Sequence, residues 1–278
     1  MKEPQSLQQM LNSDTIKRRF ESLLDTSAPS FISSVLTIFR SNSKLQDCSP
    51  SSILSAAGMA AALKLPLNPS LGFAHIVPYK SQAQFQVGAR GYVQLAMRSG
   101  QYRTLHSGPV REGQIKEIDF LTGEIIRGEK ISDEIVGYVA YMELLNGFKK
   151  SLYMTVEELK AHAEKYSQSY AYDLRSGRKS SVWSTNFDAM AKKTVLKHLL
   201  SHYGIISLDQ QGYTMIKALQ ADQSVITDEG FRYIDNEHGG EEKIVPFSEV
   251  TDVPKVDVEP EENNSEEQTE ETSEEKND

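Results

Sequence analysis

The sequence has little of what would cross-link the chain or place it in a membrane. It contains one cysteine, Cys48, among its 278 residues. A lone cysteine excludes an internal disulfide and a zinc site built from cysteines. No run of about 18 or more apolar residues exists, and the first ten residues lack the apolar centre of a signal peptide. We therefore expect a protein of the reducing cytoplasm with no membrane contact.

The motifs of common enzymes are also missing. Gly177-Arg178-Lys179-Ser180 ends like a phosphate-binding loop, but Tyr172 stands where that loop requires its first glycine. His198 and His202 have the spacing of a metal-binding pair on a helix, but no glutamate lies between them to act as a base. Surface histidines are the better interpretation. We expect a protein without ATPase, metal-dependent or other catalytic activity.

The net charge of −9 conceals two unlike parts of the chain. Residues 241–278 contain 15 acidic and 3 basic residues and almost no aromatic ones, whereas residues 1–220 carry a net charge of +7. A segment as acidic and as poor in aromatic residues as 241–278 cannot bury enough apolar surface to fold. We therefore predict a folded core over residues 1–220 and an acidic, largely disordered tail over residues 221–278. A basic core permits nucleic-acid binding without establishing it.

Apolar residues at helical spacing predict helices in the first part of the chain. One covers residues 14–26, a second begins near Pro29, and a third begins at Ser49-Pro50. The third is rich in small residues from Ser55 to Ala62, which let another helix approach closely. That neighbour lies either inside the fold or in a second protomer, and we favour internal packing.

Alternating polar and apolar residues predict strands in the middle of the chain. Thr104–Arg111 and Ile115–Phe120 can pair with each other, and Asn146-Gly147 closes a hairpin between Ile135–Leu145 and Phe148–Met154. Hairpins produce an antiparallel sheet. Together with the helices, they predict an α+β fold in which helices pack on a twisted antiparallel sheet, behind an N-terminal helical segment.

Two further helices are predicted after the sheet. Thr155 and Glu158 form a capping box that begins a helix reaching about Tyr166. Residues 167–181 are interpreted as a polar loop. A long helix then runs from Trp183 to about Tyr203.

The stretch 84–103 links the strands to the charge pattern. It predicts a short strand and then a helix in which Arg90 and Arg98 share one face. No acidic residue occurs between Gln84 and Arg111. Basic residues gather there and on two later segments, which suits a phosphate backbone. We predict that nucleic acid contacts Lys80, Gln86, Arg90, Tyr92, Arg98, Arg103, Arg111, Arg175, Arg178, Lys179, Lys192, Lys193 and Lys197.

Two aromatic residues have an alternative role. Tyr92 and Trp183 fit the hydrophobic core, which we favour, and each could instead stack on a base. Gly88 and Gly91 are interpreted as points at which a backbone approaches closely.

These residues carry a resemblance to a known family. Over roughly residues 50–205 the chain resembles the RecT family of phage single-strand annealing proteins. The motifs follow the family order: Leu67-Asn68-Pro69, Val77-Pro78-Tyr79, Gln84 through Tyr92, Arg98-Ser99-Gly100, Val110-Arg111-Glu112-Gly113, and Trp183 through Leu199 with Met190-Ala191-Lys192-Lys193-Thr194. One departure is Asn186-Phe187, where the family pattern leads us to expect a second tryptophan.

The resemblance implies a function in phage homologous recombination. Such proteins bind single-stranded DNA and anneal complementary strands without ATP, in rings or helical filaments. It implies a basic DNA groove, no cofactor, Mg²⁺ at most assisting annealing, and as partners a phage exonuclease and a host single-strand DNA-binding protein. The tail is then a solubilising end, or alternatively a docking segment or a competitor for the groove. The rival functions are a metal-dependent nuclease and a DNA-binding protein that does not anneal.

Overall fold

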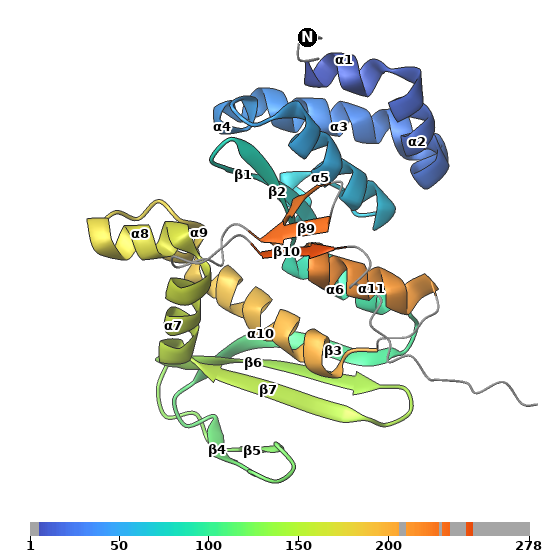
Figure 1. The fold of residues 1–278 in the computed structure, drawn as a ribbon. Helices are drawn as coiled ribbons and strands as arrows, with labels where there is room; N and C mark the ends of the chain where they lie inside the picture. The colour runs from blue at the N-terminus through green and yellow to red at the C-terminus, as the bar shows by residue number, and fades with distance from the viewer. Residues whose placement is uncertain (1–5, 206–209, 228–229, 234–242, 247–278) are drawn as a thin grey trace, which may run out of the picture.

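The structure is a computed structural model that describes residues 6–205, 210–227, 230–233 and 243–246. Helices gather at the N-terminal end and against antiparallel sheets (Figure 1). The predicted α+β class, with its N-terminal helical segment and antiparallel sheet, is confirmed. No helix within these ranges is long and apolar enough to cross a bilayer. Most of the predicted acidic tail lies outside the described residues.

Helices form the first part of the chain: α1 (Leu7–Asn12), α2 (Asp14–Leu24), α3 (Ala28–Ser41), α4 (Ser43–Gln46) and α5 (Pro50–Ala62), with a 3₁₀ turn at Asp25–Ser27. The predicted start of α5 is confirmed, because the Ser49 hydroxyl accepts the Ser52 N–H and Pro50 occupies the first turn. Four of its alanines, Ala56, Ala57, Ala60 and Ala61, are buried, and the helix packs against the β-hairpin that follows and against the first two helices, whereas Ala62 is exposed. The structure therefore places these four alanines in internal packing.

A two-stranded hairpin and a short helix follow. After a 3₁₀ turn at Pro69–Leu71, β1 (Ala74–Tyr79) pairs antiparallel with β2 (Gln82–Val87), and α6 covers Ala89–Arg98. Gly100 ends this segment with φ of 65°, a conformation that glycine adopts at little cost. The predicted order of strand, helix and strand is confirmed here.

The main sheet has the order β3-β6-β7, formed by β3 (Tyr102–Arg111), β6 (Ile135–Leu144) and β7 (Lys149–Thr155). The predicted Asn-Gly hairpin is confirmed, with Gly147 at φ of 88°. The expected pairing of Thr104–Arg111 with Ile115–Phe120 is wrong. β3 pairs with β6, and β4 (Ile115–Ile118) pairs with β5 (Ile125–Arg127). Turn signals mark local hairpins, but the sheet joins strands that are distant in sequence.

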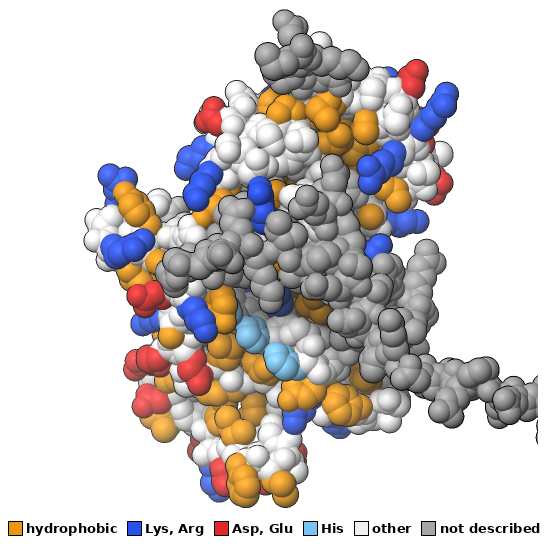
Figure 2. Space-filling model, in the orientation of Figure 1, with side chains coloured by type: hydrophobic (Ala, Val, Ile, Leu, Met, Phe, Trp, Pro, Cys, Tyr) orange, Lys and Arg blue, Asp and Glu red, His pale blue; other side chains and the backbone are white. Residues whose placement is uncertain are grey.

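The helices after the sheet are α7 (Val156–Tyr166), α8 (Gln168–Ser176), α9 (Val182–Thr185) and α10 (Phe187–Tyr203). The capping box of α7 is confirmed. The loop predicted for residues 167–181 is wrong, because most of it forms α8, which buries Tyr170 and Ala171. The predicted long helix is broken at Asn186, whose side chain caps α10. Figure 2 shows acidic side chains gathered over α7 and basic ones at the end of α8.

The folded core continues beyond residue 220. α11 (Gln210–Ala221) packs on α6, and β8 (Val225–Ile226) lies beside β2. β9 (Gly230–Tyr233) and β10 (Lys243–Pro246) complete a three-stranded sheet. Asp222, Val225 and Phe231 are buried. The chain that we assigned to the tail therefore begins with residues of the core.

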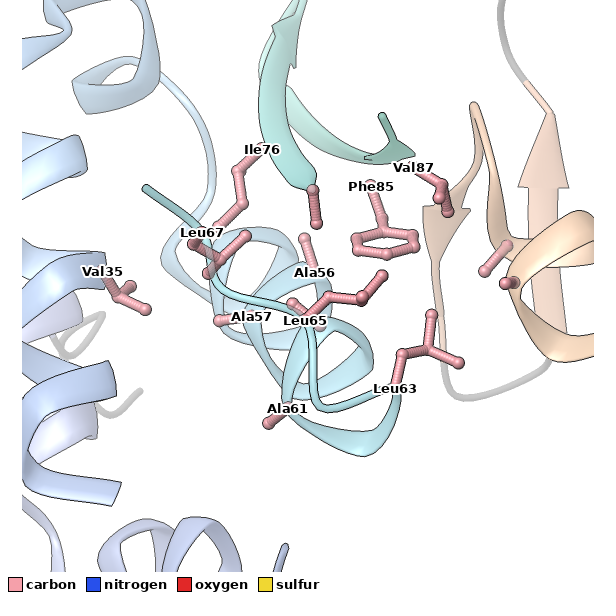
Figure 3. Close-up of a cluster of buried hydrophobic side chains, with 14 of the residues drawn as sticks. Val35, Ala56, Ala57, Ala61, Leu63, Leu65, Leu67, Ile76, Phe85 and Val87 are labelled. Carbon is pink, nitrogen blue, oxygen red and sulfur yellow. The ribbon is translucent and has the colours of Figure 1, made fainter. Parts of the chain in front are cut away.

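Two hydrophobic clusters hold the fold together. The first joins α1–α6, the β1–β2 hairpin, α11 and β9, and Figure 3 shows Phe85 of β2 above the alanines of α5. The second lies between the main sheet and α10, around Tyr138, Met142 and Trp183. α10 contributes to both clusters, with Leu196 in the first and Leu199 in the second. It therefore fixes the position of the sheet against the N-terminal half.

Candidate nucleic-acid interface

A cleft of about 860 Å³ lies between the N-terminal half and the start of α10. One wall comes from the α3–α4 turn and from residues of the segment 67–78, which includes β1. The β2–α6 junction, residues 86–90, continues that wall, and α9 and the start of α10 face it. The cleft thus collects segments that are distant in sequence.

The cleft is basic. Lys44, Arg90 and Lys193 line it, and none of the described lining residues is acidic. Arg90 is exposed and donates from Nη1 to the Leu71 carbonyl oxygen at 3.3 Å, which holds its guanidinium at the wall. Gln86 is half-buried and adds an amide. Three cationic side chains around one cavity suit the phosphates of a nucleic acid.

The N-terminus of α6 adds a second source of positive potential. Gly88 is its N-cap, and no described side chain caps the helix. The free N–H groups of a first helical turn carry the positive end of the helix dipole and commonly bind phosphate. Gly88, Ala89 and Arg90 all line the cleft. The helix end and the basic side chains therefore point to the same kind of ligand.

Gly88 and Gly91 are indeed points of close approach, but the approaching backbone is the chain's own. A Cβ atom on Gly88 would lie 2.0 Å from the Gly72 carbonyl oxygen, and one on Gly91 would lie 2.1 Å from that of Phe73. The Gly88 N–H donates to the Phe73 oxygen at 2.8 Å. The two glycines therefore lock α6 against the segment that precedes β1.

An ion cluster lies behind the cleft. Lys193, which is buried, and Lys197 both donate to the Asp222 carboxylate, at 3.3 Å and 2.8 Å. Burial lowers the pKa of Lys193, and Asp222 opposes that effect. Burial raises the pKa of Asp222, but the two lysines and the Val87 N–H outweigh it and lower the value to about 2. Two of the predicted contacts on α10, Lys193 and Lys197, therefore have an acidic counterpart.

Two predicted DNA contacts are occupied within the fold: Tyr92 lies in the core, and Arg98 is half-buried against carbonyl groups of its own chain. The Tyr92 side chain is 0% exposed, so it cannot reach a base, and its hydroxyl faces Asp222. Arg98 donates to the carbonyl oxygens of Leu63 and Lys64 at 2.6 and 2.7 Å and thereby caps the end of α5. Trp183 is also buried, against Tyr170 and Phe187. The core interpretation that we favoured for Tyr92 and Trp183 is therefore what the structure shows.

Three more predicted contacts form ion pairs on the surface. Arg103 pairs with Glu143, Arg111 with Asp133 and Lys192 with Asp188, at 3.0, 3.5 and 2.7 Å. The acid-free run therefore has acidic partners from other parts of the chain. Lys80 lies exposed at the turn between β1 and β2, beside the Tyr79 ring. The structure does not bring these four residues into the cleft.

The last group lies at the end of α8. Arg175, Arg178 and Lys179 are exposed, and the Arg178 guanidinium lies 5.9 Å from the centre of the Tyr172 ring. The buried Asp173 carboxylate fixes the turn that follows, because it accepts hydrogen bonds from Ser180, Ser181 and Ser184. These bonds hold the pKa of Asp173 far below its usual range. The turn leads to Val182 at the cleft edge.

Sequence reasoning missed two residues of this site. Lys44 precedes the acid-free run, so the pattern that selected the others excluded it. Asp222 was assigned to the acidic tail by composition. The apolar spacing of Met215, Ala218 and Ala221, all buried, was the available signal that the core continues to this aspartate.

Comparisons with known proteins identify a family. The sequence model of the RecT family matches residues 29–238. The chain is similar to an uncharacterized protein of Bacillus subtilis (strain 168), YqaK, with 43% identity over 204 residues, which is 73% of this chain and 68% of the relative. It is 28% identical over 210 residues to Protein RecT of Escherichia coli (strain K12), which is 69% of this chain and 74% of that protein.

Proposed function

The chain belongs to the RecT family, whose members anneal single strands in DNA recombination, and on that premise we propose that it binds single-stranded DNA in the basic cleft and pairs complementary strands without ATP. The observation that carries the proposal is the cleft itself. Three basic side chains and the N-terminus of α6 surround it, and none of its described lining residues is acidic.

The chemistry of the cleft suits backbone recognition. Lys44, Arg90 and Lys193 attract phosphates of any sequence, whereas reading a sequence would require contacts to base edges. A strand held by its phosphates leaves its bases available to a second strand. Correct pairing then stabilises the bound state through stacking between the bases. An annealing protein needs this lack of sequence preference.

The remaining features of the function are part of the same proposal. The protein is not an enzyme and needs no nucleotide or other cofactor, and Mg²⁺ at most assists annealing. It works as a ring or helical filament in the cytoplasm of a bacterial host. Its partners are a phage exonuclease, which exposes the strands, and a host single-strand DNA-binding protein. Within the described residues, no group of three or more His, Cys, Asp and Glu side chains is placed to hold a metal ion.

One assay tests the proposal directly. Complementary oligonucleotides are mixed with the full chain without ATP, and duplex formation and strand length are followed together. We expect faster pairing of intact strands. Shortened strands would instead indicate a nuclease, and binding without faster pairing would indicate a DNA-binding protein of another kind. Either result contradicts the proposal.

A matched pair of variants assigns the activity to the cleft. Lys44→Ala with Arg90→Ala removes two cations from the cleft, and Arg18→Ala with Arg19→Ala removes two exposed cations from α2. We expect the first pair to weaken binding to all sequences and to flatten its dependence on salt. The second pair should bind much as the unmodified chain does. An equal loss of DNA affinity in the two double variants would mean that the DNA does not bind in the cleft.

A further inference from the structure

Asp222 is the most enclosed charged group of the described chain. It follows α11 directly, and its side chain is 0% exposed. Its Oδ1 accepts the Val87 N–H at 2.8 Å and the Lys193 ammonium at 3.3 Å, and its Oδ2 accepts the Lys197 ammonium at 2.8 Å. One carboxylate thus connects α10, the end of β2 and the segment behind α11.

The other titratable groups around this carboxylate are neutral near pH 7. Burial raises the pKa of Tyr92 well above its usual value and that of Tyr233 to about 12, and Asp222 adds to both effects. Burial, with Lys193, lowers the pKa of His75. The charges of the cluster are therefore one carboxylate and two ammonium groups, and of these two lysines Lys193 is the one that lines the cleft.

A buried ammonium group needs a counterion. Removing a charge from water is costly, and a lysine without a partner in such a place gives up its proton instead. Lys193 lines the cleft although its side chain is only 11% exposed. Without Asp222 it would lose its proton at a lower pH and would then face the cleft as a neutral amine. An ammonium in this poorly hydrated place also attracts a phosphate more strongly than a fully hydrated one does.

The same carboxylate fixes the backbone beside the cleft. Val87 is the last residue of β2, and Gly88 after it is the N-cap of α6. The hydrogen bond from Val87 to Asp222 therefore holds the junction from which the N-terminus of α6 and Arg90 face the cleft. Lys193 and the junction that carries the N-terminus of α6 and Arg90 are therefore both held by one residue of the C-terminal segment.

We propose that Asp222 is a positioning residue for DNA binding, which keeps Lys193 charged at the cleft and holds the β2–α6 junction in place. This inference rests on the DNA-binding function proposed above. It makes the segment behind α11 part of the DNA site, although Asp222 itself repels phosphate. An acidic residue is then required for binding a polyanion.

The test is a pH profile of DNA affinity for a set of variants. Asp222→Asn keeps the shape and an oxygen that can accept the Val87 N–H, and it removes only the charge. With a labelled oligothymidylate, we expect the unmodified chain to bind with nearly constant affinity from about pH 6 to 9. Asp222→Asn should match it at the acid end and weaken about tenfold as pH rises and Lys193 loses its proton.

A second substitution separates this role from a structural one. Arginine stays protonated at all these pH values, so Asp222→Asn combined with Lys193→Arg should bind with a flat profile again. A general loss of folding in Asp222→Asn would instead weaken binding at every pH and would not respond to arginine. An Asp222→Asn profile that is flat and equal to that of the unmodified chain would overturn the proposal.

A measurement on the unmodified chain keeps the inference testable if Asp222→Asn does not fold. The Nζ resonance of Lys193 in an NMR spectrum, assigned by its loss in Lys193→Met, should report an ammonium group up to pH 9 or above. Loss of its proton near pH 7 would contradict the role given to Asp222. This readout needs no DNA, so it distinguishes the two failures: a chain that binds no DNA refutes the proposed function, whereas a Lys193 that is neutral near pH 7 refutes the role of Asp222 alone.

Discussion

At the scale of single residues, two arginines of one helix have different roles. Arg90 is exposed at the cleft wall, whereas Arg98 caps the carbonyl end of α5 with two hydrogen bonds. Because they are two helical turns apart on one helix face, the sequence predicted the same DNA-binding role for both. The carbonyl groups that surround each guanidinium decide the difference, because a charge already bound to a helix end is not available to phosphate.

Alanine at each of these positions should therefore affect a different measurement. Arg90→Ala should lower the affinity for single-stranded DNA by roughly five- to tenfold, about 1 kcal/mol, without changing the melting temperature. Arg98→Ala should lower the free energy of unfolding by roughly 1–3 kcal/mol, because two carbonyl groups lose a charged donor. Titration with an oligonucleotide and thermal unfolding check both. If Arg98→Ala bound DNA weakly and remained as stable as the unmodified chain, Arg98 would be a DNA contact and its structural role would be wrong.

A cluster of histidines predicts how stability depends on pH. The His162 ring of α7 lies 5.1 Å from that of His198 on α10, and burial, with His198, Lys197 and Lys165, lowers the pKa of His162 to about 4. The unfolded chain takes up that proton near pH 6.5. The contribution of this group is therefore complete above pH 6.5 and is lost as pH falls towards 4.

Chemical denaturation between pH 7 and 4 measures this effect. The unmodified chain should lose up to roughly 3 kcal/mol over that range from His162, since one pKa unit corresponds to about 1.4 kcal/mol. His162→Phe should remove most of this slope. His106→Asn, a substitution on an exposed strand residue, serves as the control and should leave the slope unchanged. Parallel slopes in all three chains would contradict the prediction.

At the scale of the elements, one glycine in α5 and one in α6 differ in how closely another backbone segment approaches them. A Cβ atom at Gly91 of α6 would collide with the Phe73 carbonyl oxygen, whereas Gly58 of α5 has no atom within 4 Å of that position. Both glycines are inside helices, where alanine is intrinsically favoured by about 1 kcal/mol. The main difference between the two sites is what the added methyl group would meet.

Gly58→Ala should raise the free energy of unfolding by roughly 0.5–1 kcal/mol, and Gly91→Ala should lower it by more than about 2 kcal/mol. Because α6 carries the cleft wall, Gly91→Ala should also weaken DNA binding at temperatures where it remains folded. Denaturation curves and binding isotherms of the two variants check this. A Gly91→Ala chain as stable as Gly58→Ala would show that the segment before β1 can move away.

At the scale of the whole molecule, truncated chains can show where the folded core ends. Ending the chain after residue 246 retains α11 and β8–β10, and ending it after residue 220 removes Asp222, Val225 and Phe231 from the core. We expect the first truncation to fold and bind DNA like the full chain. The second should unfold or lose cooperative melting, because buried side chains such as Phe231 each contribute about 1.5–3 kcal/mol.

Circular dichroism melts and DNA titrations of the two truncations decide between them. A folded and active chain of 220 residues would mean that the core ends where its composition changes. A loss of DNA binding in the chain that ends after residue 246 would give the acidic tail a direct role in DNA binding.

Local chemistry in the sequence determined the elements whose partners are close along the chain. The Asn-Gly hairpin, the capping box at Thr155 and the start of α5 at Ser49 and Pro50 each depend on residues within a few positions. The family motifs and the charge pattern likewise pointed to the RecT family and to phosphate recognition, because both are patterns of residue type along the chain.

Only the tertiary structure decided which charges are available. Arg98, Arg103 and Lys192 appear as free cations in the sequence, but each meets its partner in the fold, and the pairing of β3 with β6 is equally non-local. Asp222 belongs to an acidic segment that its composition assigned to the tail, but its side chain is buried in the core. The residue type decides only that a side chain can carry a charge. Whether that charge faces DNA, a helix end or a buried carboxylate depends on which distant segments the fold brings beside it.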